Sequence, residues 1–235
     1  MPGLFFVEAR RRIERGAGSL ERLHDELTAH GRRVDAARTH VDEHKAEKSW
    51  IDVLEGVGSL EPLFGRTIRE FSVADFLLVA AAEAFVNAVA AHVLPPAELE
   101  NFEKLSPTGK WLFLPRIMKL KWKPKLDKGC LQQFASLVAR RNRVVHPRVV
   151  RVKNTVEVGR FVDQLKLEAE SANRGVECVR ELIREISLSW RGGYGPDWLY
   201  GDSARKRPPC FVLGSIDAPA RLGRRSSKRS RTEQA

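Results

Sequence analysis

Apolar residues recur at helical spacing along most of the chain and predict a mainly helical protein. Their recurrence every three or four positions from Leu20 to Val41 predicts a charged helix over residues 17–47. Gly31 and histidines at two apolar positions weaken this heptad-like seam. We therefore expect the helix to pack against the body of the protein or a partner helix rather than form a long coiled coil.

A second helix is predicted to begin at Ser72, after a break in the chain. Gly56-Val57-Gly58 and Glu61-Pro62 predict the break. Ser72 is a favourable N-cap, and Asp75 three residues later occupies the second position of a capping box. The helix should end before Pro95-Pro96.

The segment 76–94 of this helix is almost entirely apolar, which raises the alternative of a membrane span. Glu83, Asn87 and His92 lie in its interior, where polar groups are costly in lipid. A central bundle helix buried on all sides is therefore favoured, and no membrane association is expected. Because a buried carboxylate is costly alone, Glu83 is predicted to meet a cation, such as an arginine, or to face a cleft.

Four further helices are predicted towards the C-terminus: residues 97–104, a helix capped by Ser106 and begun by Pro107, residues 130–145, and residues 155–190. His146-Pro147 ends the third of these, because proline disfavours helical geometry in the residue before it. The predicted fold class is all-α, a four- to five-helix bundle with an extra N-terminal charged helix. The predicted organisation is a helical extension (1–71), a helical bundle (72–200) and a basic, disordered tail (201–235).

The net charge of +11 is concentrated in one loop and in the tail. Residues 119–128 hold five lysines and one acid (+4), and residues 202–235 hold nine basic and three acidic residues (+6). Local basicity of this kind predicts contacts with a polyanion such as RNA. The alternative is a solvated loop and a solubilising tail.

The three cysteines, Cys130, Cys178 and Cys210, are widely spaced and form no CxxC pair. Neither a disulfide framework nor a thiolate zinc site is expected. The N-terminal apolar run is too short for a secretory signal. These features predict a reducing compartment and a cytoplasmic location, with no metal and no cofactor.

The strongest motif, Arg141-Asn142-Arg143-Val144-Val145-His146, lies at the end of a predicted helix. With 28 arginines, five asparagines and six histidines in 235 residues, chance predicts about 0.015 occurrences of Arg-Asn-x-x-x-His. The alternative is a C-terminal helix cap, in which cations complement the helix dipole and His146 bonds to a carbonyl.

Here the sequence resembles the HEPN superfamily, whose catalytic members carry Arg-polar-x-x-x-His near the end of a core helix in a four- to five-helix bundle. Residues 82–87 are similar to the Glu- and Asn-containing helix that many HEPN proteins place upstream, and Lys110-Trp111 and Leu114-Pro115 are also similar. The resemblance covers roughly residues 72–190. It implies a metal-independent endoribonuclease that leaves 2′,3′-cyclic phosphate ends, and many HEPN proteins are toxins or defence effectors.

Five residues on an ideal helix turn through about 500°, so Arg141 and His146 point about 140° apart. Pro147 releases His146 from helical geometry, which lets the two side chains converge. A two-fold dimer that brings two helix ends together also solves the problem, and HEPN ribonucleases are similar in using such a composite cleft. We therefore expect a homodimer.

RNA cleavage without metal needs a group that accepts the 2′-hydroxyl proton and a cation that stabilises charge on the phosphate. His146 suits the first task and Arg141 the second, with Asn142 in an orienting role. Glu83 and Asn87 are further candidates for orientation. The predicted RNA contacts are Arg140, Arg143, Arg148, Lys121, Trp122, Lys123 and Lys125.

Two other interpretations stay open. A non-catalytic HEPN-like scaffold would bind RNA or a protein through the basic loop and tail. A helical adaptor would recruit a partner through the seam led by Leu20, Leu23 and Leu27. The expected partners of the enzyme are RNA, a second copy of the chain and, for a toxin, a neutralising protein.

Overall fold

A computed structural model describes residues 1–39, 43–145, 156–191, 196 and 199 of the chain. Within these ranges there is no strand, only an isolated bridge between Lys125 and Lys128. This confirms the predicted all-α class. The helices are α1 (Pro2–Thr39), α2 (Glu43–Val93), α3 (Pro96–Glu103), α4 (Pro107–Ile117), α5 (Gly129–Val145) and α6 (Val156–Arg191).

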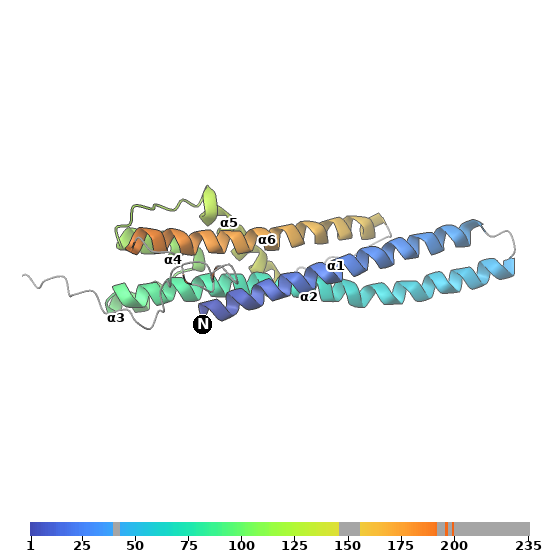
Figure 1. Ribbon diagram of the computed structural model, residues 1–235, viewed down its shortest axis with the longest axis horizontal. Helices are drawn as coiled ribbons and strands as arrows, with labels where there is room; N and C mark the ends of the chain where they lie inside the picture. The colour runs from blue at the N-terminus through green and yellow to red at the C-terminus, as the bar shows by residue number, and fades with distance from the viewer. Residues whose placement is uncertain (40–42, 146–155, 192–195, 197–198, 200–235) are drawn as a thin grey trace, which may run out of the picture.

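The long helices lie side by side in an elongated bundle (Figure 1). α1 and α2 form an antiparallel hairpin, and α6 packs beside both. α5 packs against α2 and α6, while α3 and α4 lie towards the C-terminal end of α2. The hairpin continues well past the N-terminal end of α6 (Figure 1).

The main apolar core lies where α1, α2, α4, α5 and α6 meet. Trp111 of α4 is fully buried, stacks on Phe85 of α2 and meets Phe134 of α5 edge to face. Burial of each such side chain contributes about 1.5–3 kcal/mol. A second, smaller cluster of Leu23, Leu60 and Leu165 joins the hairpin to α6. Other buried members of the main core include Phe6, Phe71, Leu78, Leu131, Leu137, Leu182 and Ile186.

The predicted break before Ser72 is wrong, because α2 is one helix from Glu43 to Val93. Pro62 lies inside it with its ring exposed, at a cost of about 3 kcal/mol in a helix interior. Packing of Leu60 against Leu23 of α1 and Leu165 of α6 spans this position and offsets that cost. Ser72 is consequently a mid-helix residue rather than an N-cap.

The N-terminal helix is longer than predicted at its start. α1 begins at Pro2, and Phe6, Ala9 and Ile13 belong to the main core. The predicted packing of the seam against the body is confirmed, since Leu23 is fully buried against α2 and α6. The proposed boundary between residues 71 and 72 falls inside α2, and the tail 201–235 lies outside the described residues.

The shorter helices follow their local sequence signals. Ser106 caps α4, because its hydroxyl accepts a hydrogen bond from the backbone N–H of Gly109 at 3.1 Å. α4 ends two residues after Pro115. The predicted helices over 97–104, 130–145 and 155–190 are confirmed as α3, α5 and α6 within a residue or two.

One part of α2, Leu60–Val93, is long and apolar enough to cross a membrane, and an 18-residue window within it has a mean hydropathy of 1.8. In the protein, 44% of that apolar window is buried against the other helices. The core helix of a soluble protein has the same composition. Burial on all sides, as predicted, is not observed, because Phe76 is 51% exposed.

A matched pair of glycines tests the α1–α2 packing. A Cβ at Gly16 would lie 2.8 Å from the ring of Phe71, whereas a Cβ at Gly18 would meet nothing within 4 Å. Gly16→Ala should therefore lower the free energy of unfolding by about 1–3 kcal/mol through overpacking. Gly18→Ala should raise it by about 0.5–1 kcal/mol through helix propensity. Urea denaturation followed by circular dichroism measures both, and equal effects would contradict the close helix contact.

Candidate functional site

The motif falls at the C-terminal end of α5. Arg141, Asn142 and Arg143 lie in its last turns, while His146 and Arg148 lie outside the described residues. Arg141 continues the inward stripe of Phe134 and Leu137 at helical spacing. Its side chain is half-buried, whereas Asn142 and Arg143 are exposed.

The end of α5 is held in place by Arg140. Its guanidinium donates two hydrogen bonds to the carboxylate of Asp75 on α2, Nε to Oδ2 at 2.8 Å and Nη2 to Oδ1 at 3.0 Å. Nη2 also donates to the backbone carbonyl of Ser171 on α6, at 3.0 Å. A Glu168 oxygen lies 4.0 Å from Nε. One side chain thus joins three helices immediately before the motif.

This ion pair is largely out of water. The side chains of Arg140 and Asp75 are 15% and 7% exposed. Burial raises the pKa of the Asp75 carboxyl above its ordinary value, and the hydrogen bond and charge of Arg140 only partly offset this effect. Sequence reasoning gave Asp75 a capping role. The signal for its real position was an acidic residue next to the apolar segment of α2.

The guanidinium of Arg141 is less well satisfied. Its Nε is buried and has no hydrogen-bond acceptor among the described residues. Leaving a buried donor unpaired costs about 1–3 kcal/mol, and more for a charged group. Because Nε is enclosed by protein, an anion at the end of α5 would have to be bound by the terminal nitrogens of this half-buried side chain.

Glu83 meets a cation, as predicted, but that cation is Lys110 of α4, with Nζ 2.6 Å from Oε1. Lys110 is only 3% exposed, so the pair belongs to the α2–α4 packing. The Oδ1 atom of Asn87 is buried without a partner in the described part of the chain. Glu83 lies eight residues from Asp75, about 12 Å along α2. The structure does not bring Glu83 and Asn87 to the Arg140–Asp75 contact.

The lysine loop lies at the opposite end of α5. Lys121, Lys123 and Lys125 are exposed, whereas Trp122 is half-buried and packs against the core. From Gly129 to Arg141 is 12 residues, about 18 Å along the helix axis. Loop and motif therefore form two separate basic surfaces rather than one.

The cysteines in the described ranges are free and buried. The thiol of Cys178 donates to the carbonyl of Cys130 at 3.1 Å, which fastens α6 to the start of α5. Burial raises the pKa of Cys130 to about 11 and that of Cys178 further. Both are therefore unreactive thiols. Within the described ranges, no group of three or more His, Cys, Asp or Glu side chains could hold a metal.

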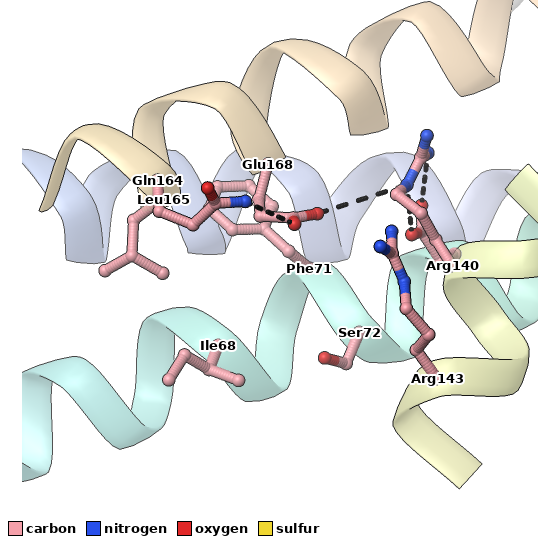
Figure 2. Close-up of a pocket in the computed structure, with 9 residues that line it drawn as sticks. Ile68, Phe71, Ser72, Arg140, Arg143, Gln164, Leu165 and Glu168 are labelled. Carbon is pink, nitrogen blue, oxygen red and sulfur yellow. Dashed lines mark hydrogen bonds and ion pairs between the residues drawn. The ribbon is translucent and has the colours of Figure 1, made fainter. Parts of the chain in front are cut away.

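Figure 2 shows the pocket beside Arg140, at the junction of α2, α5 and α6. Arg140 and Arg143 both project towards it. Arg141 does not line it, because it projects from a different side of α5.

Comparisons with protein-family models, with curated proteins and with solved structures found no match to this chain. The resemblance to HEPN proteins therefore rests on the residues quoted above.

Proposed function

We propose that this protein is a metal-independent endoribonuclease of the HEPN type. The observation that carries the proposal is the state of Arg141. It sits at a helix end braced by the Arg140–Asp75 pair, and its buried Nε has no acceptor in the described structure. A guanidinium on a half-buried side chain at a braced helix end is suited to a phosphate. Asn142 and His146 complete the motif in sequence.

In this proposal His146 takes the proton of the 2′-hydroxyl, which then attacks the adjacent phosphorus. The phosphorus–5′-oxygen bond breaks, and the products are a 2′,3′-cyclic phosphate and a 5′-hydroxyl end. Arg141 stabilises the charge that develops on the phosphate oxygens. Asn142 orients the phosphate or the imidazole. Arg140, which the sequence suggested as an RNA contact, instead positions the helix end through Asp75.

The proposed active form is a homodimer that acts in the cytoplasm. Phe76 on α2 is 51% exposed and lies one helical turn from Ser72, which lines the same pocket as Arg143. This exposed ring near the end of α5 supports pairing of two copies near their motifs. The buried, reduced thiols fit a reducing compartment.

The test is a cleavage assay in EDTA with purified full-length protein, on single-stranded and on structured RNA. The proposal expects cleavage with cyclic phosphate ends, detected by mass spectrometry of the products. Inactivity of a well-folded dimer on both substrates would reject it. A toxin or defence role adds the expectation of growth arrest on expression, relieved by His146→Ala or by a neutralising protein.

A second candidate function is a non-catalytic scaffold that binds RNA through the basic loop and tail. The exposed lysines of the loop favour it, since they lie about 18 Å along α5 from the motif. In the scaffold, loop and tail changes should weaken RNA binding more than changes at His146. The adaptor, by contrast, predicts loss of a protein partner when Leu20 and Leu27 are replaced, with RNA irrelevant.

The loop lysines should contribute to RNA affinity through counterion release. Replacing Lys121, Lys123 and Lys125 together by alanine should reduce the slope of log K against log salt by about 2, at roughly 0.7 per contact with single strands. Fluorescence anisotropy from 50 to 300 mM KCl measures the slope. Replacing the exposed Lys104, which pairs with Glu100 on α3, is the control and should leave the slope unchanged. An unchanged slope for the triple variant would remove the loop from the RNA surface.

A further inference from the structure

The pocket between α2, α5 and α6 has a volume of about 240 Å³. Drug-sized ligands occupy pockets of roughly 300–1,000 Å³. This one therefore has room for a single ring system. Figure 2 shows its walls, formed by Ile68, Phe71, Ser72 and Asp75 of α2, Arg140 and Arg143 of α5, and Gln164, Leu165 and Glu168 of α6.

The pocket has an apolar side and a polar rim. Phe71 and Leu165 are buried, and Ile68 is 41% exposed at the edge. The flat ring of Phe71 and the branched side chains of Leu165 and Ile68 offer an apolar surface to one face of a ligand ring. Ser72 and Gln164 supply polar groups that both donate and accept hydrogen bonds.

Some of those polar groups are unused. The hydroxyls of Thr67, Ser136 and Ser187 donate to the carbonyl four residues earlier in their helices. The Ser72 hydroxyl makes no such bond within the described structure. Gln164 donates one N–H to Glu168 at 3.1 Å, which leaves its amide oxygen and second N–H for another partner. A ligand with donors and acceptors along one edge would satisfy both side chains.

The charges around the pocket cancel. The carboxylates of Asp75 and Glu168 offset the guanidinium groups of Arg140 and Arg143. A phosphate would meet two carboxylates there as well as two arginines. An uncharged ligand is therefore favoured over an anion.

We infer that this pocket binds the base of an RNA nucleotide whose backbone passes Arg143 at the rim. The inference rests on the proposed function, because RNA is the ligand that presents uncharged, edge-bonding rings beside phosphates. It adds a specificity site to the nuclease. The base packs against the apolar side and is read by Ser72 and Gln164, while Arg143 contacts the backbone at the rim.

The test measures base preference without cleavage. Full-length protein is titrated into fluorescent hexamers of adenosine, cytidine or uridine whose 2′-hydroxyls are methylated, because methylation blocks cleavage whether or not the protein is a nuclease. Wild type should bind one hexamer most tightly. Ser72→Ala and Gln164→Ala should each reduce that preference by roughly two- to tenfold, the value of one lost hydrogen bond. Ile68→Trp, which fills the pocket edge, should abolish the preference.

Matched controls are Ser187→Ala on α6 and Gln132→Ala on α5, neither of which lines the pocket. Both should keep the wild-type ranking of the hexamers. Equal binding of all three hexamers by wild type, or an undiminished preference in Ser72→Ala and Gln164→Ala, overturns the inference. If wild type selects a base through these residues but fails to cleave RNA in EDTA, the pocket stands and the nuclease proposal falls.

Discussion

Replacing His146 by alanine should lower the rate of metal-free RNA cleavage by about 10²–10⁴-fold, the usual contribution of a general acid–base group. Binding should change little, because the phosphate is held by Arg141 and by lysines elsewhere. The rate is followed in EDTA by gel electrophoresis of a labelled RNA, and binding by anisotropy. His92→Ala is the matched control, because this exposed histidine on α2 bonds only to a carbonyl of its own helix.

Arg141 should behave differently from His146. Arg141→Ala should reduce both cleavage and affinity, because it removes the cation from the ground state and the transition state alike. Arg141→Lys should recover part of the affinity but little of the rate, since lysine keeps the charge without the planar fork. Arg184→Ala on the exposed side of α6 serves as the control. Wild-type rates for the His146 and Arg141 variants would show that the motif is a helix cap.

Asp75→Ala should lower the free energy of unfolding by about 3–5 kcal/mol, because it removes the carboxylate that accepts two hydrogen bonds from the buried Arg140 guanidinium. The end of α5 would lose its link to α2, so cleavage should fall even where the variant stays folded. The double variant Asp75→Ala, Arg140→Met should be less damaged than the sum of its single changes. Urea denaturation measures all three.

The control for this pair is exposed. Glu100→Ala breaks the Lys104–Glu100 pair on the surface of α3 and should cost no more than about 0.5 kcal/mol. A similar small cost for Asp75→Ala would show that the Arg140 contact does not brace the motif. If a folded Asp75→Ala variant still cleaves RNA, the Arg140–Asp75 contact is not needed for activity.

The raised pKa of Asp75 gives the pair a pH signature. Between the ordinary value of 3.8 and the raised folded value, the folded chain binds more protons at this group than the unfolded chain. Stability from Asp75 is therefore largest at low pH and falls as pH rises through that window. Wild type should show this fall relative to Asp75→Asn in urea denaturation from pH 3.5 to 7.

Local signals predicted those parts of the fold that depend on local chemistry. Ser106-Pro107 began α4 and His146-Pro147 marked the end of α5, because caps and prolines act over a few residues. The predicted break at Pro62 was wrong because packing of Leu60 on Leu23, 37 residues earlier in the chain, outweighs the local cost of the proline. The end of a helix can be predicted from nearby residues. The continuation of a helix through a proline cannot, because it depends on tertiary packing.

The candidate site likewise has features that local sequence predicted and others that depend on residues far apart in the chain. The motif residues were visible from spacing and rarity, and Glu83 was correctly expected to meet a cation. The partner of Arg140 was missed, because Asp75 lies 65 residues away and its position after Ser72 suggested a cap. The separation of the lysine loop from the motif follows from the length of the predicted helix 130–145, because the loop precedes this helix and the motif ends it.

The projecting part of the α1–α2 hairpin has a consequence for cooperativity. Within the described residues, the hairpin beyond Leu23 and Leu60 extends past the N-terminal end of α6, whereas α2 around Asp75 packs against α5 and α6. Amide hydrogens in residues 24–39 should therefore exchange with deuterium through local opening, well before those around Asp75, which need global unfolding. We therefore expect the tip of the hairpin to open and close while the end of α5 that carries the motif keeps its geometry.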